Sequence, residues 1–381
     1  MIIFRCLRNL NRFASFDEIG KLPNELQTHL DCLNNSNNYK PWIREKPVKA
    51  LAALYRAAQR LVNIESITWT KLPAVQKAIK EIPLLTDDYG MNTIQTLLIH
   101  LINLNIDDDI MWSSIEKRLI KGLADSINYE NIQCIVRSFD QADKGSEEFW
   151  INLRDIIKNK ICKENKMNAK CVATIVKVYG SKNLIDDKFL VALEGQVFRI
   201  SKDLYGEDLS IIIYMFGLKN LGNEELFALF NKQIRENKRI MDTRSLAHCL
   251  ASFIKVGQGT VDLYDDVEKE IIENPHGKQM EIGDAVGLLF AYARYLPLAV
   301  KGNAKRREFV EWTIGMIKAY INEGERLSDI SVVHSLWSLC RLNILEQHED
   351  LKSHLVTNFN RRKLTDKEEF SKLTQEIVKH I

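Results

Sequence analysis

One pattern of apolar positions recurs seven times along the chain. In each copy, nearly all of four positions spaced i, i+3, i+4 and i+7 hold apolar residues or cysteine, the spacing of one face of an α-helix. We take the last of the four positions as the anchor of each copy. The anchors are Leu101, Phe139, Tyr179, Phe216, Phe253, Tyr292 and Leu339. They are separated by 38, 40, 37, 37, 39 and 47 residues, which predicts a helical repeat of about 38 residues.

The fourth position after each anchor predicts where these helices end. It is occupied by Asn105, Asp143, Asn183, Asn220, Gly257, Leu296 and Asn343. Asn and Gly tolerate the left-handed conformation that commonly ends a helix. A second helix start follows several of these stops, as at Trp112-x-x-Ile115 and Trp150-x-x-Leu153. Because a single helix pair cannot bury its apolar face alone, we predict an all-α fold, an α-solenoid of stacked helix–turn–helix repeats.

The repeat pattern also sets the expected domain boundaries. The array should run over residues 45–363, with seven to eight units, because residues 46–63 have the pattern of a degenerate first helix. Residues 17–44, which include the polar tract from Asn34 to Asn38, are expected to be a leader and linker. Residues 364–381 are expected to form one short polar C-terminal helix.

The first sixteen residues have the character of a targeting segment. Arg5, Arg8 and Arg12 alternate with apolar residues at helical spacing, and no acidic residue occurs before Asp17. This pattern is typical of a mitochondrial transit peptide, so residues 1–16 predict import into the mitochondrial matrix. An ordinary N-terminal helix is the alternative interpretation.

Composition and charge narrow the possible functions. Apolar residues make up 45% of the chain and charged residues 27%, which excludes a disordered chain. Removing the three leader arginines from a formal charge of +2 leaves −1. Phosphate binding would therefore require cations gathered on one face. No apolar run is long enough for a membrane span, so we expect no direct insertion into a membrane.

Signatures of catalysis and metal binding are not found in the sequence. It contains no GxGxxG, GxxxxGK[ST], HExxH or GxSxG motif. The seven cysteines form no CxxC pair and no cluster with histidines at zinc spacing. We therefore expect a non-catalytic binding protein with no cofactor and no metal.

The seventh copy carries a family resemblance. Leu327-Ser328-Asp329, followed by HSLWSLCRLN from His334 to Asn343, resembles the octotricopeptide repeat and is similar to heptatricopeptide and FASTK-like repeats. The pattern extends over about residues 45–360, although only the unit around Trp337 is close in residues. The resemblance implies an organellar protein that binds RNA rather than DNA, in RNA processing, stability, translation or mitoribosome assembly. The RAP domain that ends many family members is not recognisable here.

A second stripe on the repeat helices supplies candidate binding residues. Positions −8, −5, −1 and +2 from the anchor are mostly small or polar, and helical-repeat proteins can read one base per unit with such rows. The candidates on this stripe are Thr96, His100, Asn131, Gln141, His248, Lys255, His334 and Arg341. Lys305, Arg306 and Arg307 are further candidates, for contacts with phosphates. The alternative is structural, because small residues also let helices approach closely and histidines are commonly satisfied polar groups.

Two functions remain open on the sequence alone. The first is RNA binding in mitochondria, to messenger or ribosomal RNA. The second is a protein scaffold or accessory subunit of a mitoribosome, respiratory complex or ATP synthase. Near-neutral charge favours the second, as do the apolar residues Ile211, Met215 and Leu218 on the stripe of the fourth copy.

Overall fold

The computed structural model describes residues 48, 51–52, 73–126, 129–161, 167–273 and 279–381. Over these residues the secondary structure is helical, with no strand. Adjacent helices pack on one another in the manner of an α-solenoid, which confirms the predicted fold class. The chain divides into two compact units, Met1–Met167 and Asn168–Ile381. The predicted transit peptide, the linker and most of the degenerate first helix lie outside the described residues.

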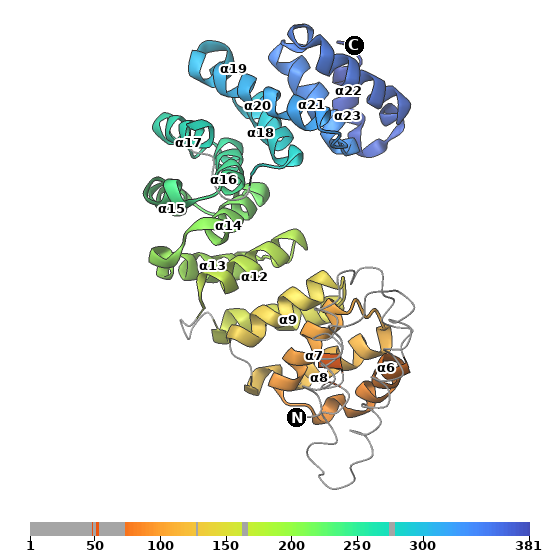
Figure 1. The fold of residues 1–381 in the computed structure, drawn as a ribbon. Helices are drawn as coiled ribbons and strands as arrows, with labels where there is room; N and C mark the ends of the chain where they lie inside the picture. The colour runs from red at the N-terminus through yellow and green to blue at the C-terminus, as the bar shows by residue number, and fades with distance from the viewer. Residues whose placement is uncertain (1–47, 49–50, 53–72, 127–128, 162–166, 274–278) are drawn as a thin grey trace, which may run out of the picture. The chain divides into compact units, whose positions relative to one another are not determined.

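The described part of unit 1 is a two-layer helical bundle. Its helices are α6 (Pro73–Leu85), α7 (Met91–Asn103), α8 (Asp109–Ser126), α9 (Tyr129–Gln141) and α10 (Glu147–Ile156). A short 3-10 turn (Thr86–Asp88) follows α6, and a π-helical turn (Ile157–Ile161) follows α10. Helix α7 packs on α9, while α8 packs on α6 and α10 (Figure 1). Phe139 joins the two layers, because its ring lies 5.1 Å from that of Trp112 and 4.3 Å from that of Phe149.

Unit 2 contains five helix pairs. The first helices are α12 (Ala169–Ser181), α14 (Gly206–Lys219), α16 (Thr243–Val256), α18 (Ile282–Tyr295) and α21 (Asp329–Leu342). The second helices are α13 (Asp187–Arg199), α15 (Glu224–Asn237), α17 (Val261–Glu273), α20 (Ala304–Asn322) and α22 (Glu349–Arg361). The first helices pack on one another in chain order, and the second helices form a separate layer beside them (Figure 1).

The predicted anchors and stops have a direct structural counterpart. All seven anchors are at most 1% exposed. Six of the seven stops adopt a positive φ: Asn105, Asp143, Asn183, Asn220, Gly257 and Asn343. Leu296 is the exception, with φ −126°, because Pro297 follows it directly and begins the extra helix α19 (Pro297–Gly302). This insertion accounts for the longest interval between anchors.

Small residues bring the first helices of unit 2 close together. A Cβ atom added to Gly217 on α14 would lie 2.6 Å from the Cβ of Ser252 on α16. Ser210 of α14 donates a hydrogen bond of 3.3 Å to Ser245 of α16. Ser245 and Ser252 belong to the predicted binding stripe, yet both are buried. For these two positions the structure supports the packing interpretation.

The C-terminal segment is less regular than predicted. Instead of one helix over residues 364–381, it forms two 3-10 turns (Leu364–Asp366 and Glu368–Phe370) and the short helix α23 (Ser371–Ile377). Helix α23 packs on α21, where Trp337 Nε1 donates a 2.6 Å hydrogen bond to Glu376. Ile377 is fully buried, so the segment covers the apolar end of unit 2.

Candidate functional site

A groove of about 710 Å³ lies across the first helices of unit 2. Its lining residues come from α14, α16, α18 and α21, together with Ser328 immediately before α21. His248 of α16 and His334 of α21 both line it. The two histidines that the sequence placed at equivalent repeat positions thus share one surface.

Two pairs of aromatic rings lie along the groove. The Tyr214 and His248 rings are 4.9 Å apart, and the Phe290 and His334 rings are 3.9 Å apart and nearly parallel, at 12°. Each pair joins position −2 of one first helix to position −5 of the next. At the intervening contact between α16 and α18, the same two positions hold Ala251 and Gly287. The groove therefore alternates between ring pairs and a stretch of small residues.

Two cations line the groove near the C-terminal ends of successive first helices. Lys255 lies in the last turn of α16 and Arg294 in the last turn of α18. The Arg294 guanidinium lies 5.6 Å from the ring centroid of Phe290 and 5.7 Å from that of Tyr295. The Nζ of Lys255 donates to the backbone carbonyl of Leu218. Among the described residues, no carboxylate lies within ion-pair distance of either cation, although Arg294 also lines a second hollow that contains glutamates.

Burial and neighbouring charge perturb two ionisable groups of the groove. Burial lowers the pKa of Lys255, and the positive charges of Arg294 and Lys219 lower it further. Burial, together with the charge of Arg294, lowers the pKa of His334 from 6.5 to about 4. His334 is therefore a neutral ring at physiological pH. Two cations, Lys255 and Arg294, in the lining of one groove are the arrangement expected of a surface that receives an anion.

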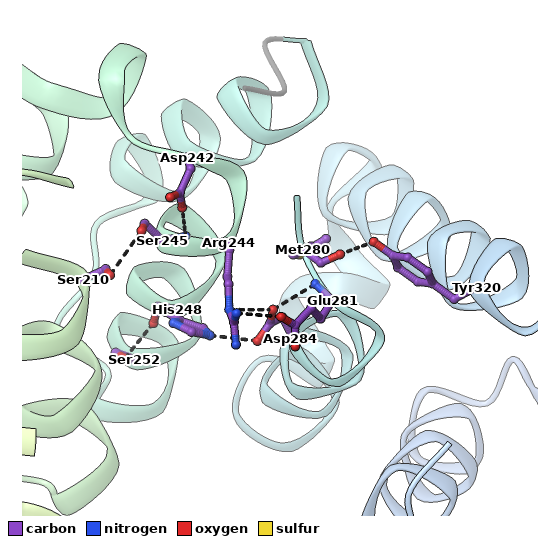
Figure 2. A network of polar contacts seen from close by, with 10 residues as sticks. All are labelled: Ser210, Asp242, Arg244, Ser245, His248, Ser252, Met280, Glu281, Asp284 and Tyr320. Carbon is purple, nitrogen blue, oxygen red and sulfur yellow. Dashed lines mark hydrogen bonds and ion pairs between the residues drawn. The ribbon is translucent and has the colours of Figure 1, made fainter. Parts of the chain in front are cut away.

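The carboxylate of Asp284, at the N-terminal end of α18, forms ion pairs and hydrogen bonds with other residues of the chain. It lies 2.8 Å from His248 Nε2 and 3.2 Å from Arg244 Nε, and it accepts a 2.9 Å hydrogen bond from the Glu281 amide (Figure 2). Burial raises the pKa of Asp284, but these hydrogen bonds and charges outweigh burial and lower it. Asp284 is the one carboxylate among the described residues that line the groove, so the two cations dominate the charge of this part of the surface.

The same network fixes the ends of α16 and α18. Asp242 caps α16 by accepting a 2.7 Å hydrogen bond from the Ser245 amide (Figure 2). The Tyr320 hydroxyl of α20 donates to the backbone carbonyl of Met280, just before α18 begins. The groove is thus built on helices whose starting points are held by side chains.

Arg341 lies in a second hollow, next to the groove. This hollow has a volume of about 590 Å³ and includes Arg294 and Trp337 in its lining. Glu368, Glu369 and Glu376 also line it. Arg341 is exposed, as the sequence prediction required, and its hollow has mixed charge, because Lys372 also lines it.

The predicted phosphate contact at Arg306 is wrong. Arg306 is only 2% exposed, because its guanidinium pairs with Glu268 and, at 2.7 Å, with Asp265. It joins α20 to α17 within the layer of second helices. Lys305 and Arg307 are exposed on α20; Lys305 lies 3.4 Å from Asp265, and Arg307 donates to the Lys301 carbonyl. None of these three arginine and lysine side chains lines the groove.

The candidates of unit 1 lie on α7 and α9. Thr96 and Gln141 are exposed, His100 is half-buried, and Asn131 is buried. The Asn131 amide donates a 3.0 Å hydrogen bond to Gln95 Oε1, so it connects α9 to α7. Asn131 is therefore a packing residue, a correction to its predicted place on an open binding surface.

The sequence prediction missed Arg294, Tyr214 and Phe290. Arg294 occupies position +2 of the sixth copy, the column that also holds Lys255 and Arg341. Extending that column to every copy would have found it. Tyr214 and Phe290 both stand at position −2, which the stripe did not include.

Comparison with known proteins does not assign the chain to a family. No protein-family model matches the chain, and no curated protein matches its sequence. Over the described residues, no group of three or more His, Cys, Asp or Glu side chains is arranged to hold a metal ion. Within that same part of the chain, no helix is both long and apolar enough to cross a bilayer. The interpretation of the groove therefore depends on its own chemistry.

Proposed function

We propose that the groove of unit 2 binds single-stranded RNA. The observation that carries the proposal is that two cations, Lys255 and Arg294, line one groove together with two pairs of aromatic rings. Proteins that bind single strands combine a positively charged track for the backbone with rings on which bases stack. Phosphates would lie along the ends of α16 and α18, and bases over the rings.

The surroundings of Lys255 favour an anionic ligand. A cation in the last turn of a helix is normally stabilised by the helix dipole. At Lys255, burial and the nearby cations outweigh that stabilisation, because its pKa is lowered. A phosphate bound between Lys255 and Arg294 would relieve their mutual repulsion and raise this pKa.

The mixed charge of the second hollow sets the expected limit of the bound strand. The second hollow has as many carboxylates as cations in its lining, so it offers no further track for phosphates. The strand would therefore cross α14, α16, α18 and α21 and leave the surface before α23. We place this activity in the mitochondrial matrix, in the processing, stability or translation of messenger or ribosomal RNA or in mitoribosome assembly, as the N-terminal segment and the octotricopeptide resemblance imply.

Equilibrium binding of a labelled single-stranded RNA, followed by fluorescence anisotropy over a range of salt concentrations, tests the proposal. We expect Lys255→Gln with Arg294→Gln to weaken binding and to reduce the slope of log K against log salt by about 1.4, because each lost phosphate contact contributes about 0.7. Lys305→Gln with Arg307→Gln is the matched control, since it removes the same charge from α20. Equal binding by the two double variants would contradict the proposal.

A polypeptide ligand is the second candidate. Leu218, Tyr295 and Ile330 line the groove and are 42%, 39% and 51% exposed. Exposed apolar side chains in a groove are typical of protein contacts, so a scaffold or accessory subunit of a mitochondrial assembly would use the same surface. Co-purification of a stoichiometric polypeptide without crosslinked RNA would favour this candidate.

A further inference from the structure

The small residues between the two ring pairs leave an open space in the groove. Ala251 of α16 and Gly287 of α18 both line the groove, at the repeat positions that hold the ring pairs Tyr214–His248 and Phe290–His334 at the neighbouring contacts. A Cβ atom added to Gly287 would meet no other atom within 4 Å. We call this space, at Ala251 and Gly287, the slot.

We infer that the slot receives one unpaired nucleobase of the bound strand, whose flanking phosphates contact Lys255 and Arg294. This inference rests on the proposed function. The slot lies between two ring pairs, and both flanking cations belong to the helices that form it, α16 and α18. A planar base filling the slot would continue the row of rings along the groove.

The neighbouring helix–helix contacts explain why the base would enter between α16 and α18. At the α14–α16 and α18–α21 contacts, a histidine from one helix already covers the aromatic ring of the other. At the α16–α18 contact the equivalent residues have almost no side chain, so the space that a ring would occupy is vacant. His334 is uncharged because its pKa is lowered to about 4, so the adjacent pair presents apolar ring faces.

The electrostatic surroundings favour a nucleotide over an apolar peptide side chain. Lys255 and Arg294 form no ion pair with a carboxylate of the described residues, and the nearby carboxylate of Asp284 is held by Arg244 and His248. A phosphate on either side of the inserted base would complement those two cations. An aromatic residue of a peptide would fill the slot but would leave both charges unpaired.

Gly287→Leu provides the direct test, because its side chain would fill the slot without a clash at the backbone. Gly315→Leu is the matched control: it makes the same change at an exposed position of α20 where an added Cβ also meets nothing within 4 Å. The probes are a single-stranded RNA oligomer and an oligomer of equal length with abasic riboses. Stacking on one base corresponds to a roughly tenfold difference in affinity.

We expect Gly287→Leu to bind the base-bearing oligomer about tenfold more weakly than the wild type, with an unchanged salt slope. On the abasic oligomer, the variant and the wild type should bind equally. Gly315→Leu should behave as the wild type on both probes. Thermal unfolding of the two leucine variants checks that both are folded.

Two results would contradict insertion of a base into the slot without contradicting RNA binding by the groove. One is wild-type affinity of Gly287→Leu for the base-bearing oligomer, together with weakened binding by Lys255→Gln with Arg294→Gln. The other is equal affinity of the wild-type protein for the base-bearing and abasic oligomers. If the wild type binds neither oligomer, the proposed function itself fails, and with it the slot.

Discussion

Arg294 and Arg306 show how the surroundings of a side chain determine its role. Arg306 is buried between Asp265 and Glu268, whereas Arg294 is exposed and lies over the rings of Phe290 and Tyr295. Both occur in helices of the same unit. One holds two second helices together, and the other offers its charge to the groove. A run of basic letters such as Lys301 to Arg307 does not reveal which arginine faces inward, because that depends on the packing of α20 on α17.

Removing Arg306 should destabilise the fold, because its guanidinium pairs with the buried Glu268. Arg306→Ala would leave Glu268 buried without its cation, which costs about 3–5 kcal/mol in the free energy of unfolding. Lys305→Ala, which removes an exposed partner of Asp265, should cost less than about 1 kcal/mol. Urea unfolding curves of the two variants measure this difference, and equal losses would show that the Arg306–Glu268 pair is not a structural contact.

His334 should make stability depend on pH in a defined direction. Its pKa in the folded chain is about 4, below the ordinary value of 6.5, so the unfolded chain binds a proton more readily between those values. The stabilisation from neutral His334 is therefore complete above about pH 6.5 and is lost as the pH falls towards about 4.

Thermal unfolding measured across that pH interval, for the wild type and for His334→Gln, isolates this contribution. The wild-type midpoint should fall more steeply with decreasing pH than that of the variant. Parallel pH profiles would contradict the assignment of a lowered pKa to His334.

At the scale of helices, the sequence predicted which segments are helical and where those helices end. It predicted less well which neighbour each helix face contacts. The anchors marked buried faces, and the stop column marked left-handed residues in six of seven copies, because both signals arise from local backbone and burial preferences. Local preference could not show whether Ser245 and Ser252 face a ligand or the next helix. That outcome depends on how closely α14 approaches α16.

The close approach at Gly217 gives a test at this scale. Gly217→Ala would push a methyl group against Ser252, so we expect a loss of about 1–3 kcal/mol in the free energy of unfolding, despite the better helix propensity of alanine. Gly315→Ala, at an open position of α20, should instead gain about 0.4–1 kcal/mol. Urea denaturation of both variants would measure the difference, and stabilisation by Gly217→Ala would argue against tight packing of α14 on α16.

At the scale of the whole molecule, net charge is a poor guide to the charge of a single surface such as the groove. The formal charge of the chain is only +2, yet Lys255 and Arg294 are gathered in one groove while Asp284 is held by other side chains. The sequence alone shows that the second position after the anchor is basic in several copies. It does not show the groove. The groove forms only when first helices of successive repeats stack, which brings together Tyr214, His248, Phe290 and His334 from four helices.

The central claim is that this groove contacts RNA, and photo-crosslinking tests it most directly. The full-length protein would be irradiated with single-stranded RNA containing 4-thiouridine, and the crosslinked peptides would be mapped by mass spectrometry. We predict crosslinks within residues 206–219, 243–256, 282–295 and 329–342. Crosslinks confined to residues 304–322 or to unit 1, or none at all, would contradict the claim.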